Sequence, residues 1–205
     1  MTHSSVQALD PGAAIAAASF AKGLALSGAA RGVLSDAASV RDFIDRLLAA
    51  ALAADALVVV ARALPKRYAI AWACDCFKTA LAGERAVTDI DRAGLALAQQ
   101  WLTDPTEENR RAALEFAERD EFASPGAWLA ASAGWGGGSL APRGYDPIEP
   151  PEHLPAEAAV AALRLLAARS ADYEAMLTGF VRRALEIFGP AGRSADATKR
   201  TGDGP

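Results

Sequence analysis

Apolar residues recur at intervals of three and four positions along most of the chain, the spacing that places them on one face of an α-helix. The first clear stripe belongs to a helix that begins near Asp36 or Ser39 and ends at about Leu52. Its apolar positions are Val40, Phe43, Ile44, Leu47, Leu48 and Ala51. The next segment, 56–64, is apolar almost throughout and fits either a helix or a buried strand. We expect a helix, because a lone strand would have no partner for its backbone groups.

The following helix is predicted to be the central one of the fold, because apolar side chains cover most of its circumference. It begins at Pro65 and ends at Gly83. Capping chemistry then marks the starts of three further helices. These starts are Thr88 with Asp91 in a capping-box arrangement, Asp104-Pro105-Thr106-Glu107 with the aspartate as N-cap, and Ser124-Pro125 with the serine as N-cap.

The pattern changes from Gly134 to Pro155, where glycine and proline become frequent. A loop of this length inside a compact domain is either functional or a spacer. An alanine- and leucine-rich helix follows to about Arg169, and a last helix spans about 172–188. Two helices are too few to form their own core, so we expect them to pack back onto the others. The predicted fold is therefore all-α, a single compact bundle of about six to eight helices with a long Gly/Pro-rich loop before the last two.

The two ends of the chain lack this pattern. Residues 1–12 are expected to be a disordered lead-in and residues 189–205 a disordered polar tail, which leaves 13–188 as one helical domain. The apolar stretch 13–30 lacks the basic start of a signal peptide and is interrupted by Lys22 and Gly23, and its structure is left open. Because no other stretch reaches the ~18 apolar residues of a membrane-spanning helix, we expect no membrane insertion and a cytoplasmic location.

Composition supports the helical prediction and narrows the class of partner. Hydrophobic residues make up 52% of the 205 residues, and alanine and leucine dominate them, which favours helices over strands. The formal net charge is -4, whereas proteins that bind nucleic acid hold its phosphates with a surplus of lysine and arginine. We therefore expect no nucleic-acid partner.

Few residues have the chemistry or spacing of a catalytic or metal site. Cys74 and Cys76 are predicted to lie within an apolar helix, roughly 200° apart, where burial raises the pKa of a thiol. His3 and His153 are the only histidines, so no His-rich metal site or serine–histidine pair is expected. The glycine run at 136–138 lacks the lysine of a phosphate-binding loop. We interpret it as a place where the chain turns sharply and passes close to a helix end, and we predict no catalytic residue, cofactor or metal.

The aromatic and loop residues are more informative. Trp72, Trp101 and Trp128 fall on predicted buried stripes and are interpreted as core residues. Trp135 lies between glycines at the head of the loop, where it either plugs the end of the bundle or meets a partner. The candidate partner-binding residues are Trp135, Leu140, Arg143, Tyr145, Ile148 and His153.

Three segments together carry a family resemblance: 63–74, with Leu-Pro-Lys-Arg before a tryptophan-bearing helix; 101–113, with Trp-x-x-Asp-Pro-x-x-x-Asn-Arg; and 138–142. They resemble an uncharacterised family of small helical bacterial proteins, a domain of unknown function that would cover about Ser35 to Phe188. The resemblance supplies no catalytic residue. It draws attention to Arg67, which we expect to pair with the carboxylate of Asp104 or Glu107.

These observations favour a non-enzymatic protein–protein interaction module, an accessory or adaptor protein of a bacterial secretion system, that binds another protein through the loop. A helical enzyme with a carboxylate and arginine site is the alternative, and a deep polar pocket with close titratable groups would favour it. A toxin-immunity-like inhibitor is a further alternative, for which an acidic exposed patch is the expected feature. Alanine-rich helices also associate closely, so a homodimer is left open.

Overall fold

The computed structural model describes residues 16–82, 87–142 and 144–188. The predicted lead-in and tail, Gly83 and Arg143 lie outside these residues. The described residues form ten helices and no strand, which confirms the all-α prediction. The helices are α1 (Ala17–Phe20), α2 (Gly28–Leu34), α3 (Val40–Ala49), α4 (Ala53–Ala63), α5 (Lys66–Ala82), α6 (Asp89–Thr103), α7 (Glu107–Arg119), α8 (Pro125–Gly134), α9 (Leu154–Ala167) and α10 (Tyr173–Phe188).

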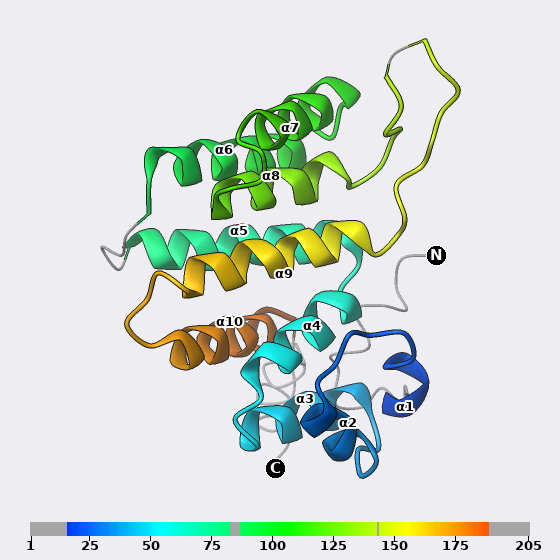
Figure 1. The fold of residues 1–205 in the computed structure, drawn as a ribbon, viewed down its shortest axis with the longest axis vertical. Helices are drawn as coiled ribbons and strands as arrows, with labels where there is room; N and C mark the ends of the chain where they lie inside the picture. Colours follow the sequence, from blue (N-terminus) through cyan, green and yellow to red (C-terminus); the bar gives the residue numbers. More distant parts are fainter. Residues whose placement is uncertain (1–15, 83–86, 143, 189–205) are drawn as a thin grey trace, which may run out of the picture.

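The helices are arranged in three tiers (Figure 1). Helices α6, α7 and α8 form one outer tier, α5 and α9 lie side by side in the middle, and α4 and α10 follow, with α1 to α3 beyond them. Helix α8 packs against α9 and α5, and α9 in turn packs against α4 and α10. The last two helices therefore return to the bundle as expected, and α5 shares the central position with α9. None of the described helices is long and apolar enough to cross a lipid bilayer.

The number of helices exceeds the predicted six to eight because the segment left open by the sequence forms two short helices. Gly23 separates α1 from α2 with a φ of 85°. Ser27 then caps α2, since its hydroxyl accepts from the Ala30 N–H at 3.1 Å. The N–H and the hydroxyl of Ser27 both donate to the Asp55 carboxylate, at 2.8 and 2.9 Å. A buried carboxylate in the first turn of α4 thus fixes the start of α2.

Two of the three predicted helix caps are confirmed. Thr88 and Asp91 form a full capping box, and Ser124 caps α8 with Pro125 in its first turn. The third prediction was wrong by two residues, because α7 is capped by Thr106 and not by Asp104. Asp104 precedes a proline, which disfavours helical backbone, and its backbone is extended.

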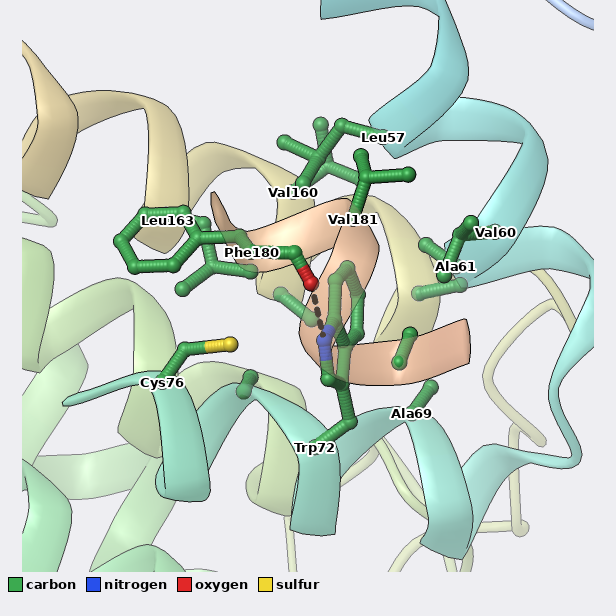
Figure 2. Close-up of a cluster of buried hydrophobic side chains, with 14 of the residues drawn as sticks. Leu57, Val60, Ala61, Ala69, Trp72, Cys76, Val160, Leu163, Phe180 and Val181 are labelled. Carbon is green, nitrogen blue, oxygen red and sulfur yellow. Dashed lines mark hydrogen bonds between the residues drawn. The ribbon is translucent and has the colours of Figure 1, made fainter. Parts of the chain in front are cut away.

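The bundle is centred on Trp72, which is fully buried (Figure 2). Its indole N–H donates to the Phe180 carbonyl of α10 at 2.9 Å, while side chains of α4, α9 and α10 surround the ring. Buried indoles need such a partner, because an unpaired N–H inside the protein is costly. Trp101 is also buried, and Trp128 is partly buried against the core, in agreement with their interpretation as core residues.

Helices α6 and α8 cross at two glycines. A Cβ atom on Gly94 would lie 2.1 Å from the Gly126 carbonyl oxygen, so only glycine permits this approach. Beside the crossing, the fully buried Asp91 carboxylate accepts from the Gly126 N–H at 3.0 Å and pairs with Arg169 beyond the end of α9. Burial alone would raise the pKa of Asp91, but these hydrogen bonds and those from Thr88 lower it below its ordinary value.

Candidate functional site

The connection between α8 and α9 is the most unusual part of the molecule. Helix α8 ends at Gly134 and α9 begins at Leu154, so residues 135–153 form the connection, here called the 135–153 loop. It projects from the bundle beside the α6 to α8 tier, running out and back (Figure 1). This loop contains the residues that the sequence marked as candidates for partner binding.

The base of the loop is held by Arg110, a buried residue of α7. Its guanidinium donates to the Gly134 carbonyl at the end of α8, at 2.5 Å, and to the Ser139 carbonyl of the loop, at 2.8 Å. Its other donors meet both oxygens of the Glu107 carboxylate, at 2.6 and 2.7 Å. A bidentate pair with a carboxylate is among the strongest protein hydrogen-bond arrangements, so Arg110 fixes where the loop leaves the bundle.

Arg111 adds a second tie of the same kind. It donates to the Glu107 carboxylate at 2.6 Å and to the Ala141 carbonyl at 3.1 Å. Hydrogen bonds from Arg110 and the charges of both arginines lower the pKa of Glu107 to about 2. Glu107 therefore stays ionised under all ordinary conditions and orients both guanidinium groups toward the loop.

The glycine run was predicted to turn sharply and pass close to a helix end, and Gly138 lies against this ion pair in the first turns of α7. Gly138 has a φ of 64°, in the left-handed region that favours glycine. A Cβ atom there would lie 2.6 Å from the Arg110 Nε and 2.6 Å from the Glu107 Oε2. The glycine allows the backbone to approach the pair closely enough for the Ser139 carbonyl to be bound.

The two arms of the loop are tied to each other above this base. The Leu140 N–H donates to the Ile148 carbonyl at 2.7 Å. The Ser139 hydroxyl oxygen accepts from the N–H groups of Ala141 and Ile148, both at 3.0 Å. These bonds hold residues 139–141 against Ile148 and give the loop the form of a narrow hairpin.

The predicted site residues do not form one surface. Trp135 packs against the bundle, where its ring stacks on Phe122 at a centroid distance of 5.9 Å and meets the edge of Trp128 at 6.2 Å. The structure thus favours the interpretation of Trp135 as a plug. His153 lies at the start of α9, half-buried, with its Nε2 3.9 Å from the Glu157 Oε2.

Three of the predicted residues are exposed together on the hairpin. Leu140, Tyr145 and Ile148 have exposed fractions of 36%, 75% and 60%. The hydrogen bond between the backbones of Leu140 and Ile148 places these two residues side by side.

Sequence reasoning missed the role of Glu107 and assigned it the wrong partner. Arg67 does not pair with Asp104 or Glu107; it donates to the Leu102 carbonyl at 2.7 Å and lies over the Trp101 ring at 6.0 Å. Glu107 is taken by Arg110 and Arg111 of its own helix, at the three- and four-residue spacings that bring side chains together. The spacing of three and four residues from Glu107 to Arg110 and Arg111 is therefore the sequence feature that could have revealed these ion pairs.

Groups suited to covalent or metal chemistry are not gathered at the loop. Burial raises the pKa of the Cys74 thiol to about 12 and that of Cys76 well above its ordinary value, as the apolar helix predicted. Across residues 16–82, 87–142 and 144–188, no group of three or more His, Cys, Asp or Glu side chains is placed to hold a metal ion. Glu118 on α7 and Glu121 in the turn that follows this helix are both exposed.

Comparison with known proteins gives a family but no function. No curated protein and no solved structure matches the chain. Residues 43–188 match the model of a family described as a family of unknown function, DUF6931. The matched range contains the Leu-Pro-Lys-Arg segment, the 101–110 motif and the whole 135–153 loop. Because the matched residues make up more than half of the chain, the chain belongs to this family of unknown function.

Proposed function

We propose that this protein is a cytoplasmic, non-enzymatic protein–protein interaction module that binds its partner through the 135–153 loop. The observation that carries the proposal is the exposure of Leu140, Tyr145 and Ile148 on a hairpin fixed by the Arg110–Glu107 pair. Seven large apolar side chains are exposed in the described chain, and three of them lie within this one hairpin. Apolar side chains gathered on a projecting segment are typical of binding surfaces.

The rigid base of the loop supports the same proposal. Ordering a loop on binding costs free energy that an already ordered loop does not lose. Arg110 and Arg111 contact backbone carbonyls of the loop, so they fix its course without using its side chains. The apolar side chains are thereby left for a partner, and we expect an apolar cleft on that partner to receive them.

The proposal is tested with a loop variant and a matched control. The loop variant carries Leu140→Ser, Tyr145→Ser and Ile148→Ser. The control carries Ile90→Ser and Ile187→Ser, which remove apolar side chains of comparable exposure, 46% and 42%, from helices elsewhere. Circular dichroism and thermal unfolding first establish that both variants fold like the natural protein.

Affinity capture from cells of the encoding organism is then compared across the three proteins, and the captured partner is purified for calorimetry. We expect one partner to bind the natural protein and the control equally, and the loop variant at least about tenfold more weakly. Equal binding of the purified partner by all three proteins would contradict the proposal. The adaptor role in a bacterial secretion system is the narrower form of the proposal, and it predicts that the partner is a component of that system.

A further inference from the structure

A cavity of about 410 Å³ opens between residues 22–25 and the helices α4 and α9. This size falls within the range of about 300 to 1,000 Å³ that is usual for sites of small organic ligands. Much of its wall is apolar and is formed by Leu24, Val58, Val160 and alanines. Of the 135–153 loop, the cavity includes only His153, so it is a separate feature of the molecule.

The charged groups around the cavity are mostly positive. Lys22, Arg62 and Arg164 line it, against a single carboxylate, Glu157. Within the described chain, none of these three cations has a carboxylate oxygen within 4.0 Å. Other arginines of this acidic protein, such as Arg46 and Arg183, are paired with carboxylates. Unpaired cations beside an apolar cavity make it a place of positive potential, which attracts an anion.

Arg164 is held in place at the wall of this cavity. One of its terminal nitrogens, Nη2, donates to the Ala54 carbonyl at 3.0 Å and so fixes the side chain. Its Nε is buried and has no hydrogen-bond partner.

We propose that this cavity binds a small organic acid with one carboxylate and an apolar chain. The carboxylate contacts Arg62 and Arg164, Lys22 adds to the positive potential, and the chain lies against Leu24, Val58 and Val160. Glu157 limits the ligand to one negative charge, because a second negative group would lie near the Glu157 carboxylate and be repelled by it. The site and the partner-binding loop are independent, so each can fail without the other.

Octanoate is the probe, and calorimetry on the full chain at neutral pH is the measurement. The matched ligands are 1-octanol, which keeps the chain without the charge, octylammonium, which reverses the charge, and acetate, which lacks the chain. We expect octanoate to bind and the other three to bind at least about tenfold more weakly. No heat of binding with octanoate, or equal binding of octanol, would overturn the proposal.

Charge variants locate the bound carboxylate. Arg62→Gln changes an exposed arginine without an ion pair, so we expect the fold to persist and octanoate affinity to fall about tenfold. Arg182→Gln, an exposed arginine on α10, is the matched control and should leave the affinity unchanged. Glu157→Gln removes the opposing charge and should raise the affinity about threefold. Equal affinities for the natural protein, Arg62→Gln and Glu157→Gln would place octanoate elsewhere and overturn the proposal.

Discussion

At the scale of single residues, the placement of the 135–153 loop depends on one carboxylate and two guanidinium groups. Arg110 is buried, and its charge is acceptable there because Glu107 and two backbone carbonyls satisfy its donors. Removing one member of such a group leaves the others unpaired, which costs more than the pair itself contributes. The effect of Glu107 on stability should therefore be measurable although its side chain is 45% exposed.

The difference in the free energy of unfolding between the natural protein and Glu107→Gln should depend on pH. The folded protein holds the pKa of Glu107 at about 2, below the ordinary value of 4.5. A lowered pKa stabilises the folded state above pH 4.5, and this stabilisation is lost as the pH falls toward 2. We expect the variant to be less stable at pH 7 by about 1 kcal/mol, a figure that allows for solvent screening of the exposed carboxylate.

Urea unfolding of both proteins at several pH values between 7 and 2.5 tests this prediction. The difference in the free energy of unfolding should stay constant down to about pH 4.5 and then shrink. Glu115→Gln is the control, since this residue is an exposed glutamate of the same helix. A difference between Glu107→Gln and the natural protein that is the same at every pH would contradict the assigned role.

Residue pairs within one helix were predictable from the sequence, whereas pairs between helices were not. Glu107 meets Arg110 and Arg111 at spacings of three and four, which the sequence displays directly. Arg67 comes from another helix, and nothing in the sequence states how far α5 lies from α7. Its guanidinium reaches the exposed end of α6, at the Leu102 carbonyl, before any carboxylate.

At the scale of elements, helix ends were predictable and helix crossings were not. Capping uses residues that are neighbours in sequence, so Thr88 with Asp91 and Ser124 with Pro125 were recognised from local pattern alone. Gly94 lies inside α6, where glycine merely weakens a helix in isolation. Glycine is needed at this position because the backbone of Gly126 in α8 lies against it, and only the packed structure shows this contact.

Gly94→Ala should therefore destabilise the protein, although alanine favours helices. The added Cβ would lie 2.1 Å from the Gly126 carbonyl oxygen and would force α6 and α8 apart. We expect a loss of about 2 kcal/mol in the free energy of unfolding, after the helix-propensity gain is included. Gly179→Ala is the control, because this exposed helical glycine has nothing within 4 Å of an added Cβ.

The control should gain about 0.5–1 kcal/mol, since alanine loses less backbone freedom on folding. Chemical denaturation of both variants measures the two changes in the free energy of unfolding, which should have opposite signs. If Gly94→Ala were as stabilising as Gly179→Ala, this result would contradict the close contact between the backbones of α6 and α8.

At the scale of the whole molecule, the sequence predicted the class of fold and the return of the last two helices, but not the order of the tiers. Apolar periodicity shows which face of a helix is buried and does not name the helix that covers it. For this reason α5 was expected to be central on its own, whereas α9 lies beside it and contacts helices on both sides. Trp72 fits this arrangement, because its indole in α5 reaches a carbonyl of α10.

Asp91 links the outer tier to the middle one, so its replacement should loosen α6 and α8 together. The carboxylate is fully buried and accepts from Thr88, from the start of α8 and from Arg169 beyond α9. Asp91→Ala leaves the Gly126 N–H and Arg169 without this acceptor, and we expect a loss of about 3 kcal/mol. Asp91→Asn should lose less, because its amide oxygen still accepts from backbone N–H groups.

Hydrogen exchange in Asp91→Ala distinguishes a link between tiers from a local helix cap. If Asp91 joins the tiers, amide protection should fall in α6 and α8 while α4 and α10, which pack on the far side of α9, keep theirs. Asp89→Ala is the matched control, since Asp89 lies in the same first turn of α6 but is fully exposed, and it should leave the stability nearly unchanged. Loss of protection confined to the first turn of α6 would show that Asp91 acts as a cap alone. Loss spread equally over all helices would show that the three tiers unfold as one unit.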